Sequence, residues 1–266
     1  MWGSGESGER VRKGLTCAFT ACVLLGAWLP GACLARESAK LHVSLQPERL
    51  GAGTTILFGF SLAANPAGGV PSPLRQIDLR YPGDLGFATS GLGLESCTAT
   101  TLETAGPGDC PANSRMGYGS AIVVVPFGGQ LIDEHATIAT FMAPLSEGQI
   151  SLLYDAQGTT PLLANLVFPA ALAPGPAGGS LQTELPLVPT LPAAPDVAVV
   201  QLTSTIGPAH ILYRRRGHGH TISYTPKGVV LPRGCPHGGF RFAAQFAFAD
   251  GTRASATARV ACPRRA

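Results

Sequence analysis

Apolar and polar residues alternate with a period of two through most of the chain after its first 35 residues. Leu41, Val43 and Leu45 share one face, and residues 54–62 and 75–81 repeat the pattern. Because side chains two positions apart lie on the same face of a strand, this alternation predicts half-buried β-strands. We expect further strands at 118–127, 135–142, 148–154, 161–168, 180–187, 197–206, 210–214, 220–224, 238–248 and 253–262.

One segment departs from this alternation. Residues 96–106 begin with Ser96, a residue type that caps helices, and end with Gly106, so they predict a short helix. Since no helix of usual length separates the strands, a parallel β-α-β arrangement is disfavoured. The sequence therefore predicts an all-β fold, an antiparallel, immunoglobulin-like β-sandwich with at most one short helix.

Domain borders are weakly marked. Proline-rich stretches within residues 170–196 flank a strand-like segment, which suits edge strands as well as a linker. We divide the chain into a leader at 1–35 and two consecutive β-sandwich regions at 36–130 and 131–266. One large, continuous sandwich is the alternative.

The second region ends in a hairpin. Asp250-Gly251 stands between two alternating runs, which is a strong hairpin signal. If these two residues form the loop, Cys262 lies opposite Gly239, four residues after Cys235. The turn-forming residues 236–239 then fold the chain back, so that a disulfide clasps the open end of the hairpin.

The first 35 residues have the pattern of a secretory signal. A basic start at residues 10–13 precedes an uncharged, apolar run over residues 14–35. Small residues before the predicted cleavage point place the cut after Ala35, which makes the mature chain secreted or extracytoplasmic. Two alternatives stay open: an uncleaved membrane anchor, or lipidation of Cys33.

Charge and composition exclude one class of partner. The chain has 19 Lys and Arg and 16 Asp and Glu, for a formal net charge of +3, and the leader holds three of the basic and two of the acidic residues. The nearly neutral remainder has no general affinity for nucleic acid. Both tryptophans, Trp2 and Trp28, also lie in the leader.

The cysteines agree with export. Four follow the leader, and an even number in an exported chain predicts two disulfides. Three pairings are possible; we favour Cys97 with Cys110 and Cys235 with Cys262, because each closes a short loop. A zinc site is disfavoured, because no C-x-x-C motif is present and the thiols are widely spaced. We expect no metal and no cofactor.

These two clasps carry a resemblance. The stretch from Cys97 through "GPGDCPANSRMGYGSA", with the later "CPHGGFRFAAQFAFADGT" and the closing "VAC", resembles a group of uncharacterised secreted proteins of high-GC bacteria. The resemblance covers most of the mature chain and implies a shared exported β fold. The group has no established activity, so it implies no catalytic residues.

Candidate catalytic motifs are sparse. No G-x-S-x-G elbow occurs, and "GYGSA" at 117–121 lacks the third glycine of a phosphate loop, so it predicts a closely packed strand. Asp133, Glu134 and His135 are adjacent; at most two of them converge on a strand, and we expect them at a polar hairpin tip.

A cationic stretch, "ILYRRRGHGHTISY", is the candidate surface-binding site. A two-residue loop at Gly217-His218 pairs Tyr213 with Ile222 and Ile211 with Tyr224. Arginine repels a metal cation, so we interpret the stretch as a solvated tip able to touch a polyanion. The candidate residues are Arg214, Arg215, Arg216, His218 and His220.

Together these patterns predict an exported, non-enzymatic β-sandwich protein that acts at or outside the cell envelope by surface binding. The expected partner is an envelope polymer or another exported protein. Two alternatives are an envelope-associated hydrolase or metal-dependent enzyme, and a carbohydrate-binding module. The second would have to use tyrosines, since no tryptophan follows the leader.

Overall fold

The computed structural model describes residues 37–64, 69–87, 95–161, 163–175, 178–190, 195–217 and 219–263. The expected leader, with Cys33 and the cleavage point at Ala35, lies outside these residues. The described residues belong to one compact unit.

Strands dominate the described residues, as the alternation predicts. One α-helix, α1 (Ala99–Ala105), and one turn of 3-10 helix, η2 (Ala112–Ser114), accompany them. The strands are β1 (Ser38–Gln46), β2 (Gly53–Ala63), β3 (Leu74–Pro82), β4 (Gly86–Phe87), β5 (Arg115–Phe127), β6 (Gln130–Met142), β7 (Ser151–Gly158), β8 (Ala164–Gly175), β9 (Gly178–Glu184), β10 (Ala198–Ile206), β11 (Tyr213–Gly217), β12 (His220–Tyr224), β13 (Val229–Val230), β14 (Phe240–Phe248) and β15 (Arg253–Val260).

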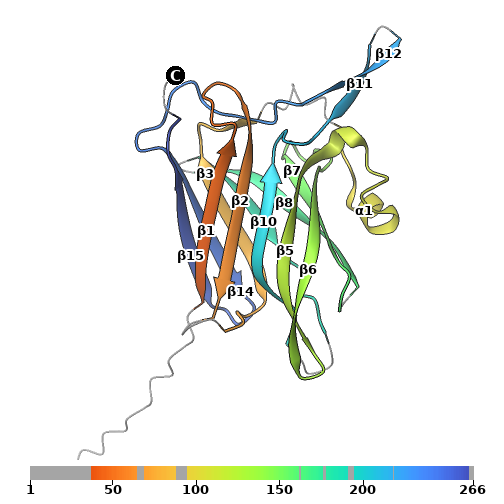
Figure 1. The fold of residues 1–266 in the computed structure, drawn as a ribbon, viewed down its shortest axis with the longest axis vertical. Helices are drawn as coiled ribbons and strands as arrows, with labels where there is room; N and C mark the ends of the chain where they lie inside the picture. The colour runs from red at the N-terminus through yellow and green to blue at the C-terminus, as the bar shows by residue number, and fades with distance from the viewer. Residues whose placement is uncertain are drawn as a thin grey trace, which may run out of the picture. The chain divides into compact units, whose positions relative to one another are not determined.

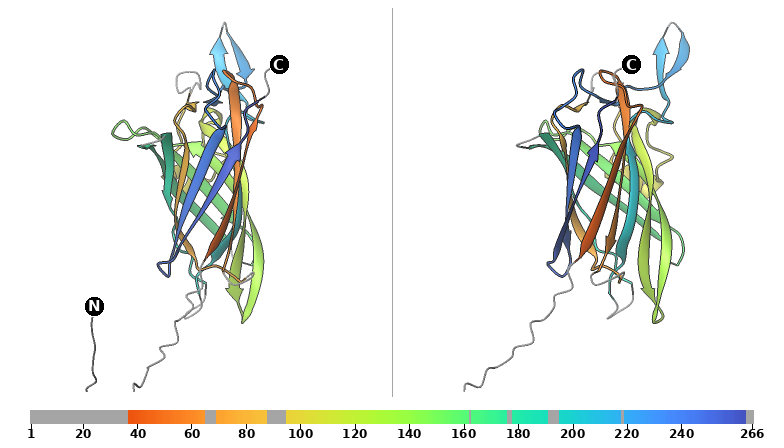
Figure 2. Two further views of the ribbon diagram at one scale, coloured as in Figure 1. Left: turned by 90° about the vertical axis from the view of Figure 1, so that its left-hand side faces the viewer. Right: turned by 60° about the vertical axis from the view of Figure 1, so that its left-hand side comes forward.

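The strands form one antiparallel sheet that curls on itself (Figure 1). Thirteen strands follow the order β15-β14-β3-β9-β8-β7-β6-β5-β10-β2-β13-β4, with β1 paired to β2. The curl brings β1 back beside β15 (Figure 2), although no ladder of paired residues joins these two strands in the described part of the chain. The result is a nearly closed, barrel-like sheet.

The antiparallel all-β prediction is confirmed, and α1 is the one α-helix of the described residues. The immunoglobulin-like sandwich is not confirmed, because the strands form one curled sheet and not two facing ones. Period-two alternation marks one buried face per strand and is the same in either architecture. The division proposed near residue 130 falls in the tight turn between β5 and β6, in the middle of this sheet.

The inner face of the sheet holds the main core. Phe58 and Phe60 of β2 and the phenylalanines of β14 point inward and are buried. The rings of Phe60 and Phe246 meet across the interior, with their centroids 4.9 Å apart. Burying a phenylalanine side chain contributes about 1.5–3 kcal/mol, so this aromatic layer is a main source of stability.

A second, smaller core lies outside the sheet. Leu102 of α1 is fully buried and packs with the Cys97–Cys110 disulfide, Phe141 of β6 and Leu153 of β7. The helix begins two residues later than predicted, because Thr98 and not Ser96 caps it, with the Thr98 hydroxyl accepting a hydrogen bond from the Thr101 amide. It ends at Gly106, as predicted.

The C-terminal hairpin has a different loop from the one predicted. The Phe248 amide donates to the Thr252 carbonyl at 3.0 Å, so three residues form the loop, and Gly251 takes a left-handed φ of 83°. Gly251 thus supplies the left-handed position of a three-residue loop. This register keeps the phenylalanine face of β14 on the core side together with Val260, whereas a shift by one residue would pair it with the polar face of β15.

Both predicted disulfides are present. Cys97 pairs with Cys110 across a Cα–Cα distance of 5.3 Å, and Cys235 pairs with Cys262 across 6.1 Å. Both distances lie in the usual range for disulfides. The first fixes α1 against the outer face of the sheet, and the second closes the open end of the β14–β15 hairpin.

Candidate functional site

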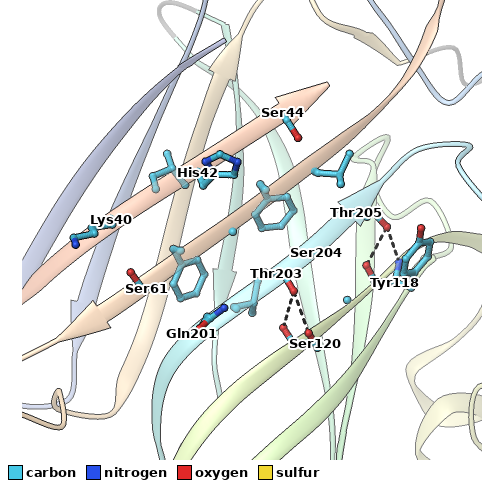
Figure 3. A pocket seen from close by; sticks show the side chains of 17 residues that line it. Lys40, His42, Ser44, Ser61, Tyr118, Ser120, Gln201, Thr203, Ser204 and Thr205 are labelled. Atoms are coloured by element: carbon cyan, nitrogen blue, oxygen red, sulfur yellow. Dashed lines mark hydrogen bonds between the residues drawn. The ribbon is translucent and has the colours of Figure 1, made fainter. Parts of the chain in front are cut away.

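A shallow groove crosses the outer face of four neighbouring strands, β1, β2, β10 and β5 (Figure 3). It is open to solvent and has a volume of about 920 Å³. Its polar lining side chains are Lys40, His42, Ser44, Ser61, Tyr118, Ser120, Gln201, Thr203 and Thr205; Ser204 lines it through its backbone, because its side chain is buried on the inner face.

Strand register places these side chains in rows across the sheet. His42 lies opposite Gly59, Gly59 opposite Thr203, and Thr203 opposite Ser120. Lys40 is the first side chain of the next row, which lies beside this central row. Each row combines side chains from segments that are distant in the sequence.

Gly59 forms the floor at the centre of the groove. A Cβ atom at this position would lie 3.1 Å from the carbonyl oxygen of Leu202 and 3.2 Å from the methyl carbon of Thr203. The missing side chain therefore lets β10 come close to β2 on the outer side, and it leaves a hollow between His42 and Thr203.

The same requirement explains the glycines of β5. Side chains at Gly117 and Gly119 would overlap the carbonyl oxygens of Thr205 and Thr203 in β10. Residues 117–121 therefore form a strand that packs closely against its neighbour, as the sequence predicts, and not a phosphate loop.

On one side of the groove, Ser120 is hydrogen-bonded to Thr203, and Tyr118 is hydrogen-bonded to Thr205. The hydroxyl oxygens of Ser120 and Thr203 are 3.0 Å apart, and the Thr205 hydroxyl donates to the Tyr118 carbonyl at 3.0 Å while it accepts from the Tyr118 amide at 3.1 Å. These bonds fix the side of the groove formed by β5 and β10.

Five other polar side chains point into the groove. Within the described residues, these side chains make no hydrogen bond or ion pair, and their donors and acceptors face solvent (Figure 3). An amide, an imidazole, an ammonium and two hydroxyls offer both donors and acceptors to a ligand. They belong to Lys40, His42, Ser44, Ser61 and Gln201.

An exposed aromatic ring stands at one edge. The Tyr118 side chain is 38% exposed, and the His210 ring meets it edge-on with centroids 6.2 Å apart. A ring held at the rim of this groove offers a flat apolar surface beside hydrogen-bonding groups.

The charge of the groove is low. Lys40 is the one permanent charge among its lining residues, His42 is the other titratable cation, and no carboxylate contributes to the lining. A hydrolase with paired carboxylates or a serine triad needs an acidic group at the reacting centre. The residues that line the groove supply no such acidic group.

The candidate cationic stretch forms a separate two-stranded hairpin, β11–β12, which projects beyond the end of the sheet (Figures 1 and 2). The predicted register is wrong by two residues. Tyr213 pairs with Tyr224 and Gly217 with His220, so the loop consists of residues 218 and 219. Gly219, with a φ of 79°, takes the left-handed conformation that the turn requires.

The structure keeps the arginines exposed but does not gather them. Arg214, Arg215 and Arg216 alternate between the two faces of the hairpin, and Arg215 lies opposite Ile222. The guanidinium carbon of Arg215 lies 5.6 Å from the centroid of the Tyr224 ring. His220 is exposed as well, whereas His218 lies outside the described residues.

The base of this hairpin is firmly held. The Asn113 side-chain amide donates to the Arg214 carbonyl and accepts from the Arg214 amide, each at 2.7 Å. The buried Tyr213 hydroxyl donates to the Arg115 carbonyl at 2.8 Å. These bonds tie the hairpin to the segment that follows the Cys97–Cys110 disulfide.

The acidic stretch at 133–135 is not a hairpin tip, which corrects the prediction. Asp133, Glu134 and His135 lie inside β6, and the turn is formed by Gly128 and Gly129. Glu134 points inward and accepts a hydrogen bond from the Thr160 amide at 3.1 Å, while Asp133 and His135 face solvent. The alternation separates the three groups, as expected for adjacent strand residues.

A buried acid and a half-buried base lie elsewhere on the outer face. Burial raises the pKa of Asp155, which accepts a hydrogen bond from Gln157 at 3.0 Å, and burial lowers the pKa of Arg115. Their mutual attraction opposes both shifts. The Arg115 guanidinium also lies over the Phe141 ring at 4.5 Å, so this pair has a structural role beside the second core.

Within the described part of the chain, no group of three or more His, Cys, Asp and Glu side chains is placed to hold a metal ion. No helix there is long and apolar enough to cross a bilayer. Comparison with known proteins finds no matching family model, no matching curated protein and no matching solved structure.

Sequence reasoning missed the groove. Its outward positions are rich in Ser and Thr, in "LHVS", "GFS", "YGS" and "QLTST", and this enrichment is the signal that was available. The neighbours of each strand were not readable, because β10 inserts between β2 and β5 from far along the chain.

Proposed function

We propose that this protein is an exported, non-enzymatic binding protein whose groove over β1, β2, β10 and β5 holds a neutral glycan segment of an envelope polymer. One observation carries the proposal. Five side chains without partners, two paired hydroxyls and an exposed tyrosine line one concave surface that has no carboxylate.

The dimensions of the groove suit a short run of sugar rings. Four strands span about 14 Å across the sheet, and the distance from Lys40 to Ser44 along β1 is about 13 Å. The rows of side chains thus offer hydrogen bonds at intervals of one strand, with the hollow at Gly59 between them.

The chemistry of the lining supports the same ligand class. Sugar hydroxyls both donate and accept hydrogen bonds, as do the serine hydroxyls and the Gln201 amide. The apolar faces of sugar rings pack on aromatic rings, and Tyr118 offers such a surface at the edge. A neutral ligand needs no group of opposite charge, so the absence of carboxylates from the groove lining costs it little binding free energy.

Export is supported by the cysteines. Two disulfides form under oxidising conditions, which are those of the cell surface and beyond and not those of the bacterial cytosol. The leader expected at residues 1–35 would deliver the chain there.

Binding to envelope fractions tests the proposal. Residues 36–266 are produced under oxidising conditions and sedimented with envelope fractions of the producing organism, untreated or treated with periodate, which cleaves sugar diols. We expect co-sedimentation with the untreated fraction and its loss after periodate. Equal binding to both fractions, or to neither, would contradict a glycan ligand.

Two variants on the same strand locate the site. Tyr118→Ala removes the ring at the groove and should weaken binding about five- to tenfold, the loss of one ring contact. Phe127→Ala is the matched control, because Phe127 is also in β5 and is 50% exposed but lies outside the groove. If both variants bind alike, the groove is not the site.

A further inference from the structure

A second groove lies on the outer face of β9, β3, β14 and β15, and its chemistry is different. It has a volume of about 1120 Å³ and a floor of small residues that includes Ala243, Gly179 and Ser180. Arginines surround this floor, with His237 at the rim. They are Arg80, Arg241 and Arg259.

Two of these arginines face each other directly. Arg241 of β14 and Arg259 of β15 are paired across the strands, a position in which like charges destabilise a sheet. Their guanidinium groups converge on the turn at Gly238. The point that a Cβ atom of Gly238 would occupy is 3.0 Å from Nη2 of Arg259 and 3.3 Å from Nη2 of Arg241.

Among the described residues, neither of the two guanidinium groups has a counter-charge. Asp78 is bound to Arg80, with Oδ2 and Nη2 3.1 Å apart. Asp84 also lines the groove, but across the described residues no ion pair or side-chain hydrogen bond joins it or another carboxylate to Arg241 or Arg259. Two repelling cations therefore stay exposed side by side.

The structure holds this arrangement in place. The Cys235–Cys262 disulfide fixes the turn at residues 236–239, and the Gly239 amide donates to the Pro236 carbonyl at 3.0 Å. Gly238 takes a φ of 84°, which a larger residue rarely adopts, and a side chain there would press on both guanidinium groups. Glycine thus leaves the arginine tips uncovered on a rigid support.

We propose that Arg241 and Arg259 together bind one phosphate group, with Arg80 and His237 beside it. A guanidinium group donates two parallel hydrogen bonds to a phosphate, and a dianion between two guanidinium groups removes the repulsion between them. The small side chains on the floor leave room for the tetrahedral group. This site is independent of the glycan groove.

A phosphate titration of the whole mature protein tests the assignment. Inorganic phosphate is added while backbone and arginine side-chain NMR signals are followed, and we expect saturable shifts at Gly238, Arg241 and Arg259. Arg241→Ala and Arg259→Ala should each weaken binding about tenfold or more, the effect of losing a charged hydrogen-bond pair.

Control variants distinguish a specific phosphate site from general attraction between phosphate and positive charge. Arg253→Ala removes an exposed arginine of the same strand, β15, from outside the groove and should leave the phosphate affinity within twofold. Arg241→Lys keeps the positive charge but loses the planar guanidinium with its paired donors. Its phosphate affinity should therefore fall between those of the wild type and Arg241→Ala. Removing one of two repelling cations should not lower the melting temperature, so loss of folding is not expected to mimic loss of binding.

Vesicles distinguish the source of the phosphate. Phosphatidylglycerol vesicles that bind the wild type, and release it when inorganic phosphate is added, would identify a lipid headgroup. Absence of vesicle binding beside a saturable phosphate response would identify soluble or polymer-borne phosphate. No saturable response to phosphate, or an equal loss in Arg253→Ala, would overturn the site.

Discussion

Two regions of this molecule hold neighbouring exposed arginines, the β11–β12 hairpin and the paired strands β14 and β15. In the hairpin, three consecutive arginines alternate between two faces, and Arg215 lies near the ring of Tyr224. In the second region, Arg241 and Arg259 are far apart in sequence yet face each other in one row. Adjacency along a strand separates side chains, whereas pairing between strands brings them together.

The two regions also differ in their support. The hairpin projects from the sheet, is held at its base, and has exposed side chains along β12 up to Ser223. The paired arginines lie on the sheet itself, beside a turn fixed by a disulfide. A binding group needs such a rigid support to hold its geometry, which favours the second region as a site.

Removing the Cys235–Cys262 disulfide should have the largest effect on stability among the changes that test the difference between the two regions. Replacing Cys235 and Cys262 by alanine removes a bridge across 27 residues and should lower the free energy of unfolding by about 3 kcal/mol. Phosphate binding should weaken too, because the turn beneath the arginines is no longer fixed. Chemical denaturation and the phosphate titration measure both effects.

The matched control is the other bridge. Replacing Cys97 and Cys110 by alanine should also lower stability, since this bridge holds α1 on the second core, but the phosphate affinity of the folded protein should not change. If both pairs of replacements weaken phosphate binding equally, the Cys235–Cys262 disulfide has no specific role in positioning Arg241 and Arg259.

Loosening the base of the hairpin should have a smaller effect. Asn113→Ala removes both hydrogen bonds to the backbone of Arg214 and should cost about 1–3 kcal/mol, because these groups are partly buried. Amide hydrogen exchange should become faster in β11 and β12 and stay unchanged in β14 and β15. Faster exchange throughout the sheet would show that the hairpin base also supports the main core.

Removing charge from the hairpin should have the smallest effect on the folded protein. Replacing Arg214, Arg215 and Arg216 by serine should change the melting temperature little, because the three side chains are exposed. Retention on an immobilised polyanion should fall as three charges are lost, and phosphate affinity at Arg241 and Arg259 should stay within twofold. A large loss of phosphate affinity would place the phosphate site on the hairpin instead.

Local patterns allowed much of the fold to be predicted. Alternation located the strands, Gly106 located the end of α1, and an even set of cysteines indicated both disulfides. Loop details were less predictable. The loop at Gly251 has three residues and not the expected two, and the two-residue loop at Gly219 is shifted along the chain. At Gly251 the core-facing side chains and not the turn residues alone select the register.

The sequence by itself determined which residues form strands, which side of each strand is apolar and which cysteines are available. These properties depend on neighbours within a few residues. The tertiary structure decided that one sheet curls until β1 lies beside β15, that β10 inserts between β2 and β5, and that Arg241 meets Arg259. Strand order depends on packing among distant segments, and an alternating pattern is the same for every order, so both grooves became visible only once the strands were in place.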